Sequence, residues 1–510
     1  MQQRVPSPAP PEPSLAPETD RHARLARLAA DAVGLDLEIP VASGGQRRRI
    51  YLDSTASTLR LGVVQDALDR YQPYYANSHS TVHFSARLST REYQWAHEMV
   101  LRFLRADPAL YTAFFVGSGT TGAMNRIAAT LARRMPERDV VITSLMEHHS
   151  NDLPHRKHFK TVVHAGTAPG ASSMGVVDVG AIEKALKSHA GRVAYVSVTG
   201  VSNVTGIVNP IHDIAALAHA HGALMVVDGA QMVAHVPVQM CGNTDPARDI
   251  DILAFSGHKI YAPGSPGVVV ARRDLFEGHE PVEVGGGMVD DVWIDRYTPT
   301  ATLPDREEAG TPNITGAIGL GAALYALDSI GMDVVFDDET RLMNRAVSAL
   351  CAMEDIVVYG CTDTAHSPRA GALSFNVRGM HHALTAAILN DHFAIAVRNQ
   401  CFCAHPYVRE MITEALAAAD IDGLTNEQLE ALAEMQRGMV RASFGIYTTD
   451  ADVDALVAAL REIAANRARY EAEYEALPDG SFRHKTFRFE PDRAFNVAGA
   501  VESWFAVGRR

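Results

Sequence analysis

A lysine and an aspartate stand at the ends of two apolar runs of this chain. Asp228 closes Val226-Val227-Asp228, and Lys259 follows the run from Ala254 through His258. A lysine that loses its proton in a partly desolvated site can form a Schiff base with an aldehyde cofactor. An aspartate facing a pyridine nitrogen keeps it protonated, so the ring can accept electrons. A single lysine is usually a solvated strand end, but the pair predicts an enzyme that uses pyridoxal phosphate.

A glycine-rich turn supplies a candidate phosphate site. The apolar run Phe114–Val116 leads into Gly117-Ser118-Gly119-Thr120-Thr121-Gly122, and a helical pattern follows over 123–133. Small residues let the backbone approach an anion, which the free amides of a helix N-terminus then bind. The spacing is not GxGxxG followed by an acid, so a dinucleotide is disfavoured. We expect a single phosphate monoester here.

The elements that position these residues alternate in type. Between Tyr111 and about residue 330, helical patterns separate six short β-branched runs, which are 114–116, 140–143, 193–198, 224–228, 250–255 and 268–271. This alternation predicts an α/β fold with a mostly parallel sheet. Ligands collect at the carboxyl ends of such strands, where Asp228 and Lys259 are expected.

The expected organisation has five parts. Residues 1–20 form a disordered Pro-rich tail, 21–60 a segment joining the small domain, and 61–330 the large cofactor-binding domain. Residues 331–475 form a small α+β domain with strands near 372–377 and 394–397, and 476–510 form an extension. The aromatic residues of the extension predict a packed surface rather than a nucleic-acid surface, because no basic excess accompanies them; they are Phe482, Phe487, Phe489, Phe495 and Trp504.

Composition excludes several classes of protein. The 510 residues are 47% hydrophobic, enough for a large core, and the net charge of -14 disfavours nucleic acid or an anionic membrane as partner. No stretch reaches the roughly 18 apolar residues of a spanning helix, so we expect a cytoplasmic protein. The five cysteines, at 241, 351, 361, 401 and 403, show no disulfide framework and no zinc-type spacing, so no metal is expected.

Ordered motifs extend this interpretation. They are Tyr51-Leu52-Asp53, Gly119-Thr120-Thr121, Met146-Glu147-His148-His149-Ser150-Asn151, Val201-Ser202-Asn203-Val204-Thr205-Gly206, Asp228-Gly229-Ala230-Gln231, Ser256-Gly257-His258-Lys259, Glu308-Ala309-Gly310-Thr311-Pro312 and Arg441-Ala442-Ser443-Phe444. Together they resemble the class V aminotransferase family of fold-type I pyridoxal phosphate enzymes. Within that family the chain is similar to the SUF-type (group II) cysteine desulfurases and selenocysteine lyases.

The resemblance implies a role for each matched residue. Lys259 would form the Schiff base, Asp228 would pair with the pyridine nitrogen, and His148 would stack on the ring. Gln231 would bind the phenolic oxygen, and Thr311 would reach the phosphate from the neighbouring subunit of a homodimer. The other cofactor-binding residues would be Gly119, Thr120, Thr121, Ser256 and His258.

The resemblance also implies sulfur chemistry. Cys403 matches the nucleophilic cysteine of the family and Arg398 its active-site arginine, while Asn203 and Arg441 would hold the substrate carboxylate. The implied activity is cysteine desulfuration, which leaves alanine and a persulfide on Cys403 for a sulfur-acceptor protein. It requires a lowered thiol pKa, which Arg398 or His405 could assist.

Four departures from the family pattern are visible. Cys401 and Phe402 replace two histidines before the nucleophile, and the resulting Cys-Phe-Cys arrangement is similar to the desulfurase domain of molybdenum cofactor sulfurases. Asn399 and Gln400 replace a Thr-Gly pair. Ser80 and Thr81 replace an Arg-Gly pair. The connection from Cys403 to Arg441 is longer than usual, with a helical pattern over 426–438 that we expect to cover the site or dock a partner.

The residues leave two alternatives to cysteine desulfuration open. A C-S β-lyase, an aminotransferase or an epimerase of the same family would use the cofactor on a cysteine conjugate or another amino acid without a cysteine nucleophile. A non-catalytic scaffold or docking protein would keep only the fold. Retention of Lys259, Asp228 and His148 together disfavours the scaffold.

Overall fold

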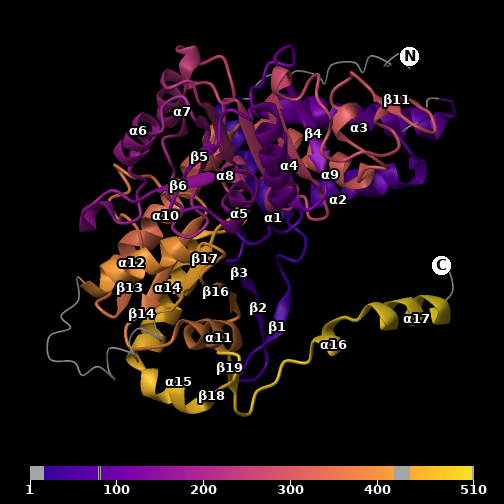
Figure 1. The fold of residues 1–510 in the computed structure, drawn as a ribbon. Coiled ribbons are helices and arrows are strands. Elements are labelled where there is room, and N and C mark those ends of the chain that lie inside the picture. Colours follow the sequence, from indigo (N-terminus) through magenta and orange to yellow (C-terminus); the bar gives the residue numbers. More distant parts are fainter. Residues whose placement is uncertain (1–16, 79, 81, 418–436, 508–510) are drawn as a thin grey trace.

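A computed structural model describes residues 17–78, 80, 82–417 and 437–507 (Figure 1). The helix expected over 426–438 lies almost entirely outside these residues, as do the first sixteen residues of the expected tail. Helix α1 (Glu18–Ala30) already begins within the last three residues assigned to that tail.

The larger lobe is built on a seven-stranded sheet. Its strand order is β4 (Tyr111–Val116), β10 (Gly267–Arg272), β9 (Ile252–Ser256), β8 (Leu224–Asp228), β7 (Val193–Thr199), β5 (Val140–Ser144) and β6 (Thr161–Ala165). Only β10 runs antiparallel to its neighbours, so the predicted mostly parallel α/β fold is confirmed. All six predicted runs are strands of this sheet, whereas β6 was not predicted.

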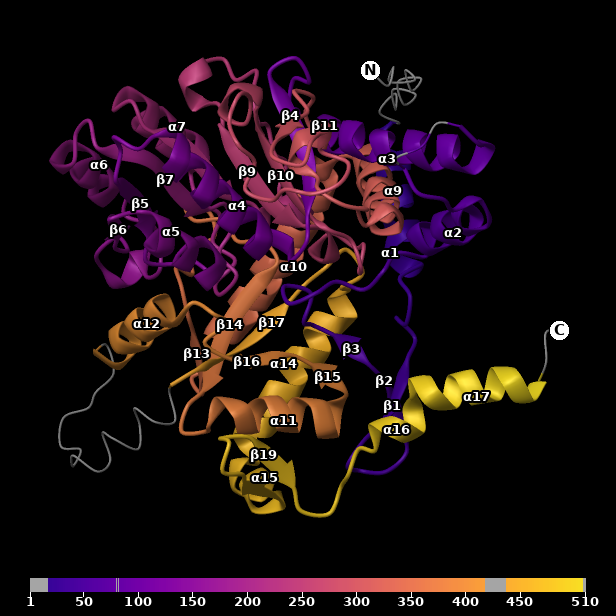
Figure 2. The same cartoon turned by 45° about the vertical axis from the view of Figure 1, so that its right-hand side comes forward.

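Both faces of this sheet are covered. Val140 and Ile142 face one apolar core, and Val141 between them faces another, as the alternation of side chains along a strand requires. The covering elements include α4 (Gly119–Arg134), α5 (Leu153–His158), α6 (Val179–Ser188), α7 (Ile211–Ala220) and α8 (Met232–His235). Helices α2 (Gly62–Tyr71), α3 (Phe84–Phe103) and α9 (Ile314–Ile330) pack together at one side of the lobe (Figure 2).

The smaller lobe has a four-stranded antiparallel sheet. Its strand order is β13 (Ile356–Val358), β14 (Ala372–Val377), β17 (Met439–Ser443) and β16 (Arg398–Gln400). Helices α10 (Met332–Cys351), α11 (His382–Phe393) and α14 (Asp450–Ala465) belong to this lobe, and α12 (His405–Ala417) follows β16. The strand expected over 394–397 is present as β15 (Ile395–Ala396), which pairs with β3 (Ile50–Tyr51), and β16 begins directly after that range at Arg398.

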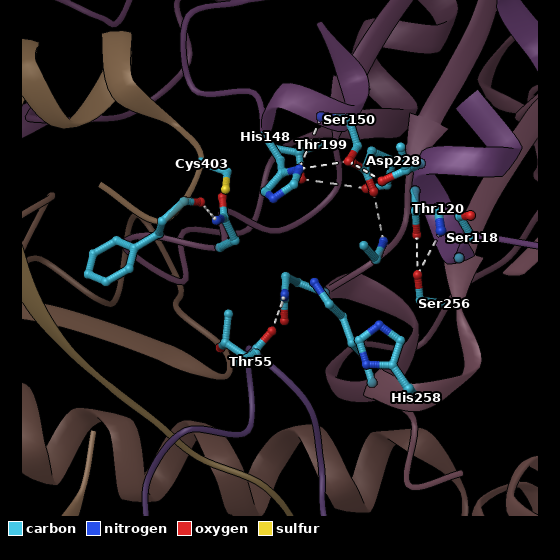
Figure 3. Close-up of a pocket in the computed structure, with 18 of the residues that line it drawn as sticks. Thr55, Ser118, Thr120, His148, Ser150, Thr199, Asp228, Ser256, His258 and Cys403 are labelled. Atoms are coloured by element: carbon cyan, nitrogen blue, oxygen red, sulfur yellow. Dashed lines mark hydrogen bonds between the residues drawn. The ribbon is translucent and has the colours of Figure 1, made fainter. Parts of the chain in front are cut away.

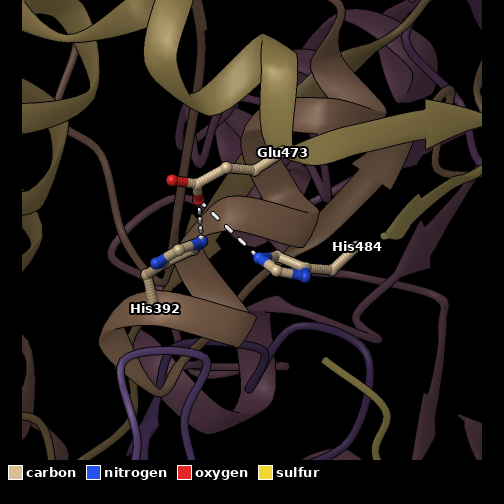
Figure 4. A group of neighbouring side chains, drawn as sticks. All are labelled: His392, Glu473 and His484. Atoms are coloured by element: carbon tan, nitrogen blue, oxygen red, sulfur yellow. Dashed lines mark ion pairs between the residues drawn. The ribbon is translucent and has the colours of Figure 1, made fainter. Parts of the chain in front are cut away.

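Three polar side chains cluster at the start of the C-terminal extension (Figure 4). Glu473 Oε2 lies 3.2 Å from His392 Nε2 and 3.7 Å from His484 Nε2. His484 Nδ1 accepts the backbone N–H groups of Thr486 (3.2 Å) and Phe487 (2.9 Å), so its Nε2 carries the proton of the neutral ring. A metal would need a lone pair there. Nε2 of the neutral His484 ring therefore offers no lone pair, while His392 Nε2 and Glu473 Oε2 are buried without a hydrogen-bond partner among the described residues.

The extension comprises α15 (Arg467–Glu473), β18 (Tyr474–Ala476), β19 (Phe482–His484), α16 (Pro491–Ala494) and α17 (Val497–Val507). The expectation of a packed extension holds for Phe482, which packs against the core of the smaller lobe. It is wrong for Phe489, Phe495 and Trp504, which are exposed, because the chain leaves the body of the molecule after β19 (Figure 1).

No single helix in the described part of the chain combines the length and apolar character needed to cross a bilayer. Only α9 and α10, bent by 82° where they meet, satisfy that test as a pair.

A buried histidine, His155 on α5, is held in its neutral form. Its Nε2 lies 3.1 Å from Asn151 Oδ1, and its Nδ1 lies 2.8 Å from the Tyr195 hydroxyl. Asn151 Oδ1 already accepts from Ser197, so His155 Nε2 donates to it and Nδ1 accepts from the tyrosine. A second ring proton would break the bond from Tyr195. Burial lowers the pKa of His155 to about 4.

We expect this histidine to make the unfolding free energy pH-dependent. Its folded pKa lies below the unfolded value of about 6.5, so its contribution is complete above pH 6.5 and falls by about 3 kcal/mol as pH drops to 4. His155→Gln should flatten this slope in urea titrations between pH 4.5 and 7.5. His366→Gln, at an exposed position, is the matched control and should keep it. Parallel slopes in the parent chain and the His155 variant would contradict the assignment.

Candidate active site

The candidate site is a cavity of about 470 Å³ at the carboxyl ends of the large-lobe strands (Figure 3). The ends of β7 and β8 and the turns after β4, β5 and β9 supply one part of its wall. Strands β16 and β17, the loop after β16 and the segment at Thr55 lie in another part. Of the residues predicted from sequence, it is lined by Gly119, Thr120, Thr121, His148, Asn203, Asp228, Gln231, Ser256, His258, Lys259, Arg398, Cys403 and Arg441. Thr311 does not line it; its hydroxyl accepts a bond from Asn77 Nδ2 at 3.1 Å.

The turn between β4 and α4 is shaped for an anion. Gly119 has φ +59°, and a Cβ there would lie 2.7 Å from Ser256 Oγ. Thr120 meets the same oxygen through its backbone N–H and its hydroxyl, both at 2.7 Å. Ser118, the N-cap of α4, makes no side-chain capping bond. The amides at the helix start therefore suit an anionic ligand.

The predicted lysine and aspartate share the cavity. Burial lowers the pKa of the Lys259 amine to about 8, an effect that the nearby Asp228 carboxylate opposes. Asp228 is buried, which raises its pKa, and one of its oxygens accepts the backbone N–H of Ala230 at 2.9 Å. A larger fraction of Lys259 is thus neutral near pH 7 than for a solvated lysine, as a nucleophilic amine requires.

His148 lines the same cavity as a neutral ring. Its Nδ1 accepts the backbone N–H of Ser150 at 3.0 Å, so the ring proton is on Nε2. Burial is the main cause that lowers its pKa to about 4, and the positive charge of Lys259 adds to the effect. The Ser150 hydroxyl bonds Thr121 Oγ1 at 2.6 Å, which ties this histidine segment to the first turn of α4. An uncharged flat ring is thereby held beside the lysine.

Two arginines meet one carboxylate at the side formed by the smaller lobe. Arg398 binds Asp53 with three contacts of 3.0 to 3.2 Å. Arg441 is buried, donates from Nη1 to the Asn203 carbonyl at 2.8 Å, and reaches Asp53 at 3.5 Å. Its Nε is buried without a hydrogen-bond partner among the described residues. An unsatisfied buried guanidinium nitrogen beside a cavity fits a ligand carboxylate.

The loop carrying Cys403 is conformationally strained. The backbone φ angle is 103° at Gln400, 49° at Phe402 and 55° at Cys403, in a region that residues other than glycine rarely adopt. Two bonds hold it: His149 N donates to the Cys403 carbonyl at 2.8 Å, and Asn203 Nδ2 donates to the Phe402 carbonyl at 2.8 Å. The Cys403 thiol is exposed and lies on the His148 side of the cavity (Figure 3).

His405 has a different neighbour from the one expected. Its Nδ1 lies 3.1 Å from His149 Nε2, and the two rings stack with centroids 4.9 Å apart. Because His149 also holds the Cys403 carbonyl, this pair fastens the loop to the histidine segment. The expected help to the thiol pKa from His405 stays a prediction.

Several lining residues were not predicted. They include Thr55, Ser118, Ser150, Thr199, Ser265 and Phe402. Ser118 and Ser150 stand inside motifs that were recognised, and Thr199 ends a predicted strand run, so the signal was present. Thr55 has no such signal; its carbonyl accepts a hydrogen bond from the Gln231 amide at 2.9 Å, and its hydroxyl is buried with no partner in the described part of the chain.

Comparisons with known proteins agree on one family. The family model for aminotransferase class-V matches residues 50–456. A probable cysteine desulfurase of Halalkalibacterium halodurans is 36% identical over 81% of this chain and 92% of its own, and a cysteine desulfurase of Yersinia pestis (strain Pestoides F) is 33% identical over 81% and 93%. The apo structure of a cysteine desulfurase from Thermococcus onnurineus NA1 superposes with a TM-score of 0.70 at 30% identity, covering 82% of this chain and 95% of that one. Cysteine desulfurase CsdA from Escherichia coli gives 0.69 at 28%, covering 86% and 98%.

We expect anion binding to depend on the glycine at the start of α4. Gly119→Ala would force a Cβ against Ser256 Oγ at a positive φ, so the affinity for inorganic phosphate should fall by about tenfold or more. Gly117→Ala is the matched control, since a Cβ there meets nothing within 4 Å. Isothermal titration with phosphate measures both. Equal affinities for the two variants would place the anion elsewhere.

Proposed function

The chain belongs to the aminotransferase class-V family, and from that premise we propose that it is a pyridoxal phosphate-dependent cysteine desulfurase. The relatives and solved structures named as cysteine desulfurases support this activity. The observation that carries the proposal is the placement of Lys259, Arg441 and Cys403 around one cavity, because a desulfurase needs an amine, a carboxylate anchor and a thiol together.

The residues present fit the cofactor. The turn at Gly119 with Ser256 and His258 would hold its phosphate, Asp228 would face its ring nitrogen, and Lys259 would hold its aldehyde carbon. His148, neutral and flat, would cover the ring, while the Gln231 amide keeps one hydrogen for the phenolic oxygen after bonding Thr55. When bound, pyridoxal phosphate supplies an electron sink for the bonds at the substrate Cα.

The substrate would be positioned by its carboxylate. Arg441 offers its free Nε and Asn203 stands beside it, which orients the Cα of L-cysteine toward the Lys259 amine. With a pKa of about 8, that amine can take the Cα proton and return it near neutral pH. The Asp53 carboxylate keeps Arg398 and Arg441 in place without occupying Arg441 Nε.

Cys403 would accept the sulfur. Its thiolate attacks the sulfur of the bound cysteine, the bond from that sulfur to Cβ breaks, and Cβ takes up a proton. The balance is L-cysteine plus the Cys403 thiol to alanine plus a Cys403 persulfide, and no outside oxidant is needed. An acceptor thiol or protein would then remove the outer sulfur.

We also propose that the enzyme is a homodimer. Thr311 lies outside the cavity of its own chain, so it could reach the phosphate of a neighbouring copy.

The decisive experiment compares alanine release from L-cysteine by the parent chain and its Cys403→Ser variant. We expect a loss of roughly 100-fold or more with retained cofactor absorbance, because the acceptor thiol is gone while the cofactor site is untouched. Cys401→Ser is the matched control and should keep most activity, since the Cys401 thiol is turned to the carbonyl of Arg437. Undiminished alanine release by Cys403→Ser, or turnover of cysteine conjugates to pyruvate instead, would favour a β-lyase.

The lowered lysine pKa gives a pH-dependent prediction. The rate at which cofactor-free protein captures pyridoxal phosphate should rise with the neutral fraction of Lys259, with its midpoint near pH 8 and a plateau about one unit higher, below the range of a solvated lysine. Asp228→Asn should move the plateau to lower pH, because the Asp228 charge raises the pKa of the amine. Stopped-flow absorbance measures the rate. A rate in the parent chain that still rises at pH 10 would contradict the desolvation argument.

A further inference from the structure

Helix α17 at the end of the described chain is apolar on all sides. Its sequence, from Val497 to Val507, contains one charged residue, Glu502. The large side chains are exposed in the single chain: Val497 by 70%, Val501 by 47%, Trp504 by 55% and Phe505 by 68%. A helix of 11 residues is marginal without packing. Its amino acids therefore indicate burial against a surface that the described part of the chain does not supply.

The helix stands away from the body on a definite side. Figures 1 and 2 both show α17 projecting on the side where α2 and α3 lie. Exposed apolar residues gather in the segment joining those two helices and at the start of α3, namely Tyr74, Tyr75, Val82 and Phe84. The hairpin of β11 (Val289–Val292) and β12 (Tyr297–Pro299) adds Val292, Trp293 and Ile294.

The segment that leads to α17 is anchored to the smaller lobe at its start, whereas α17 itself stands away from the body. Lys485 N donates to the Glu473 carbonyl at 2.8 Å, and Lys485 Nζ donates to the Ala472 carbonyl at 2.6 Å. Both bonds lie next to the polar cluster of His392, Glu473 and His484. Beyond this anchor, the five residues before α16 can span about 17 Å, and α17 adds about 16 Å. The arm is long enough to cross to a neighbouring molecule.

We propose that residues 489–507, the C-terminal arm, pack on a second copy of this chain. The inference rests on the homodimer proposed above and adds an exchange of arms between the copies. In a two-fold dimer each arm leaves its own chain and covers the apolar side of the other, so that both are buried at once. The single chain carries both halves of this contact, the apolar helix and the apolar side, and neither is covered within it.

The composition of the arm favours a protein surface over a lipid surface. A helix that lies on a membrane carries Lys and Arg along a polar face. Helix α17 has no such face, its charged residue is acidic, and the whole chain has a net charge of -14. Trp504 and Phe505, adjacent and exposed, are the side chains typical of the centre of a protein interface.

The first test measures the dimer dissociation constant of the full-length protein by analytical ultracentrifugation. Trp504→Glu combined with Phe505→Glu should raise that constant by about 100-fold or more. Leu110→Glu is the matched control, an equally exposed apolar position outside the arm and the proposed side, and should leave it unchanged. A chain ending at Arg488 should behave like the double variant. An unchanged constant in both arm variants would overturn the exchange and leave the dimer standing.

A second test identifies the contact directly. Mixed dimers are formed from unlabelled (light) chains that carry the photoreactive benzoylphenylalanine at position 505 and ¹⁵N-labelled (heavy) chains that lack it. In these dimers we expect crosslinks from position 505 of the light chain to residues 74–84 or 289–297 of the heavy chain. Crosslinks that are exclusively light-to-light would overturn the exchange, as would phosphatidylserine vesicle binding that the Arg488 truncation abolishes. A parent chain that stays monomeric at all concentrations would refute exchange and homodimer alike, while alanine release still tests desulfuration separately.

Discussion

The desolvated amine of Lys259 beside the buried carboxylate of Asp228 is the constraint on which the site depends. The two residues leave neighbouring parallel strands, β8 and β9, whose register places Asp228 opposite Ala254. The strands are buried on both faces, so the charges are held in low-dielectric surroundings, where the free energy of an unpaired charge is high. That cost shifts the pKa of the lysine down and that of the aspartate up. The chemistry of the amine is thus set by the sheet that buries it.

A second set of charged groups, two arginines and one aspartate, lies at the side of the site that the smaller lobe forms. Arg398 and Arg441 are direct partners across the antiparallel strands β16 and β17, where two like charges would repel. Asp53 contacts both guanidinium groups, and its backbone pairs with Ser443 of β17. The two arginines can therefore lie side by side because the Asp53 carboxylate, from the N-terminal part of the chain, offsets the repulsion between their positive charges.

Local patterns predicted the parts of the fold that depend on short stretches of sequence. The β-branched runs ending at Asp228 and before Lys259 are strands, and the turn at Gly119 starts a helix, because burial and glycine chemistry act within a few residues. The antiparallel direction of β10 could not be predicted, since its residues match a parallel strand equally well. Strand β16 was missed because it depends on pairing with Arg441, Val440 and Met439, which lie far along the chain. The exposed Trp504 was expected to be packed, but an apolar side chain does not reveal whether its partner is in its own chain.

A departure from the family pattern ties the loop that carries Cys403 to the buried Arg441. Phe402 stands where the family has a histidine, and its ring lies 4.6 Å from the Arg441 guanidinium, within the range of a cation–π contact. Its carbonyl accepts the Asn203 side chain, while the Asn203 carbonyl accepts Arg441. A closed set of contacts therefore links Phe402, Asn203 and Arg441, one residue from Cys403. Because Phe402 adopts a left-handed backbone conformation, these contacts also offset the strain that presents the thiol. Sequence resemblance marks Phe402 as a substitution, whereas in the structure its contacts connect the backbone that carries the Cys403 thiol to the Arg441 guanidinium.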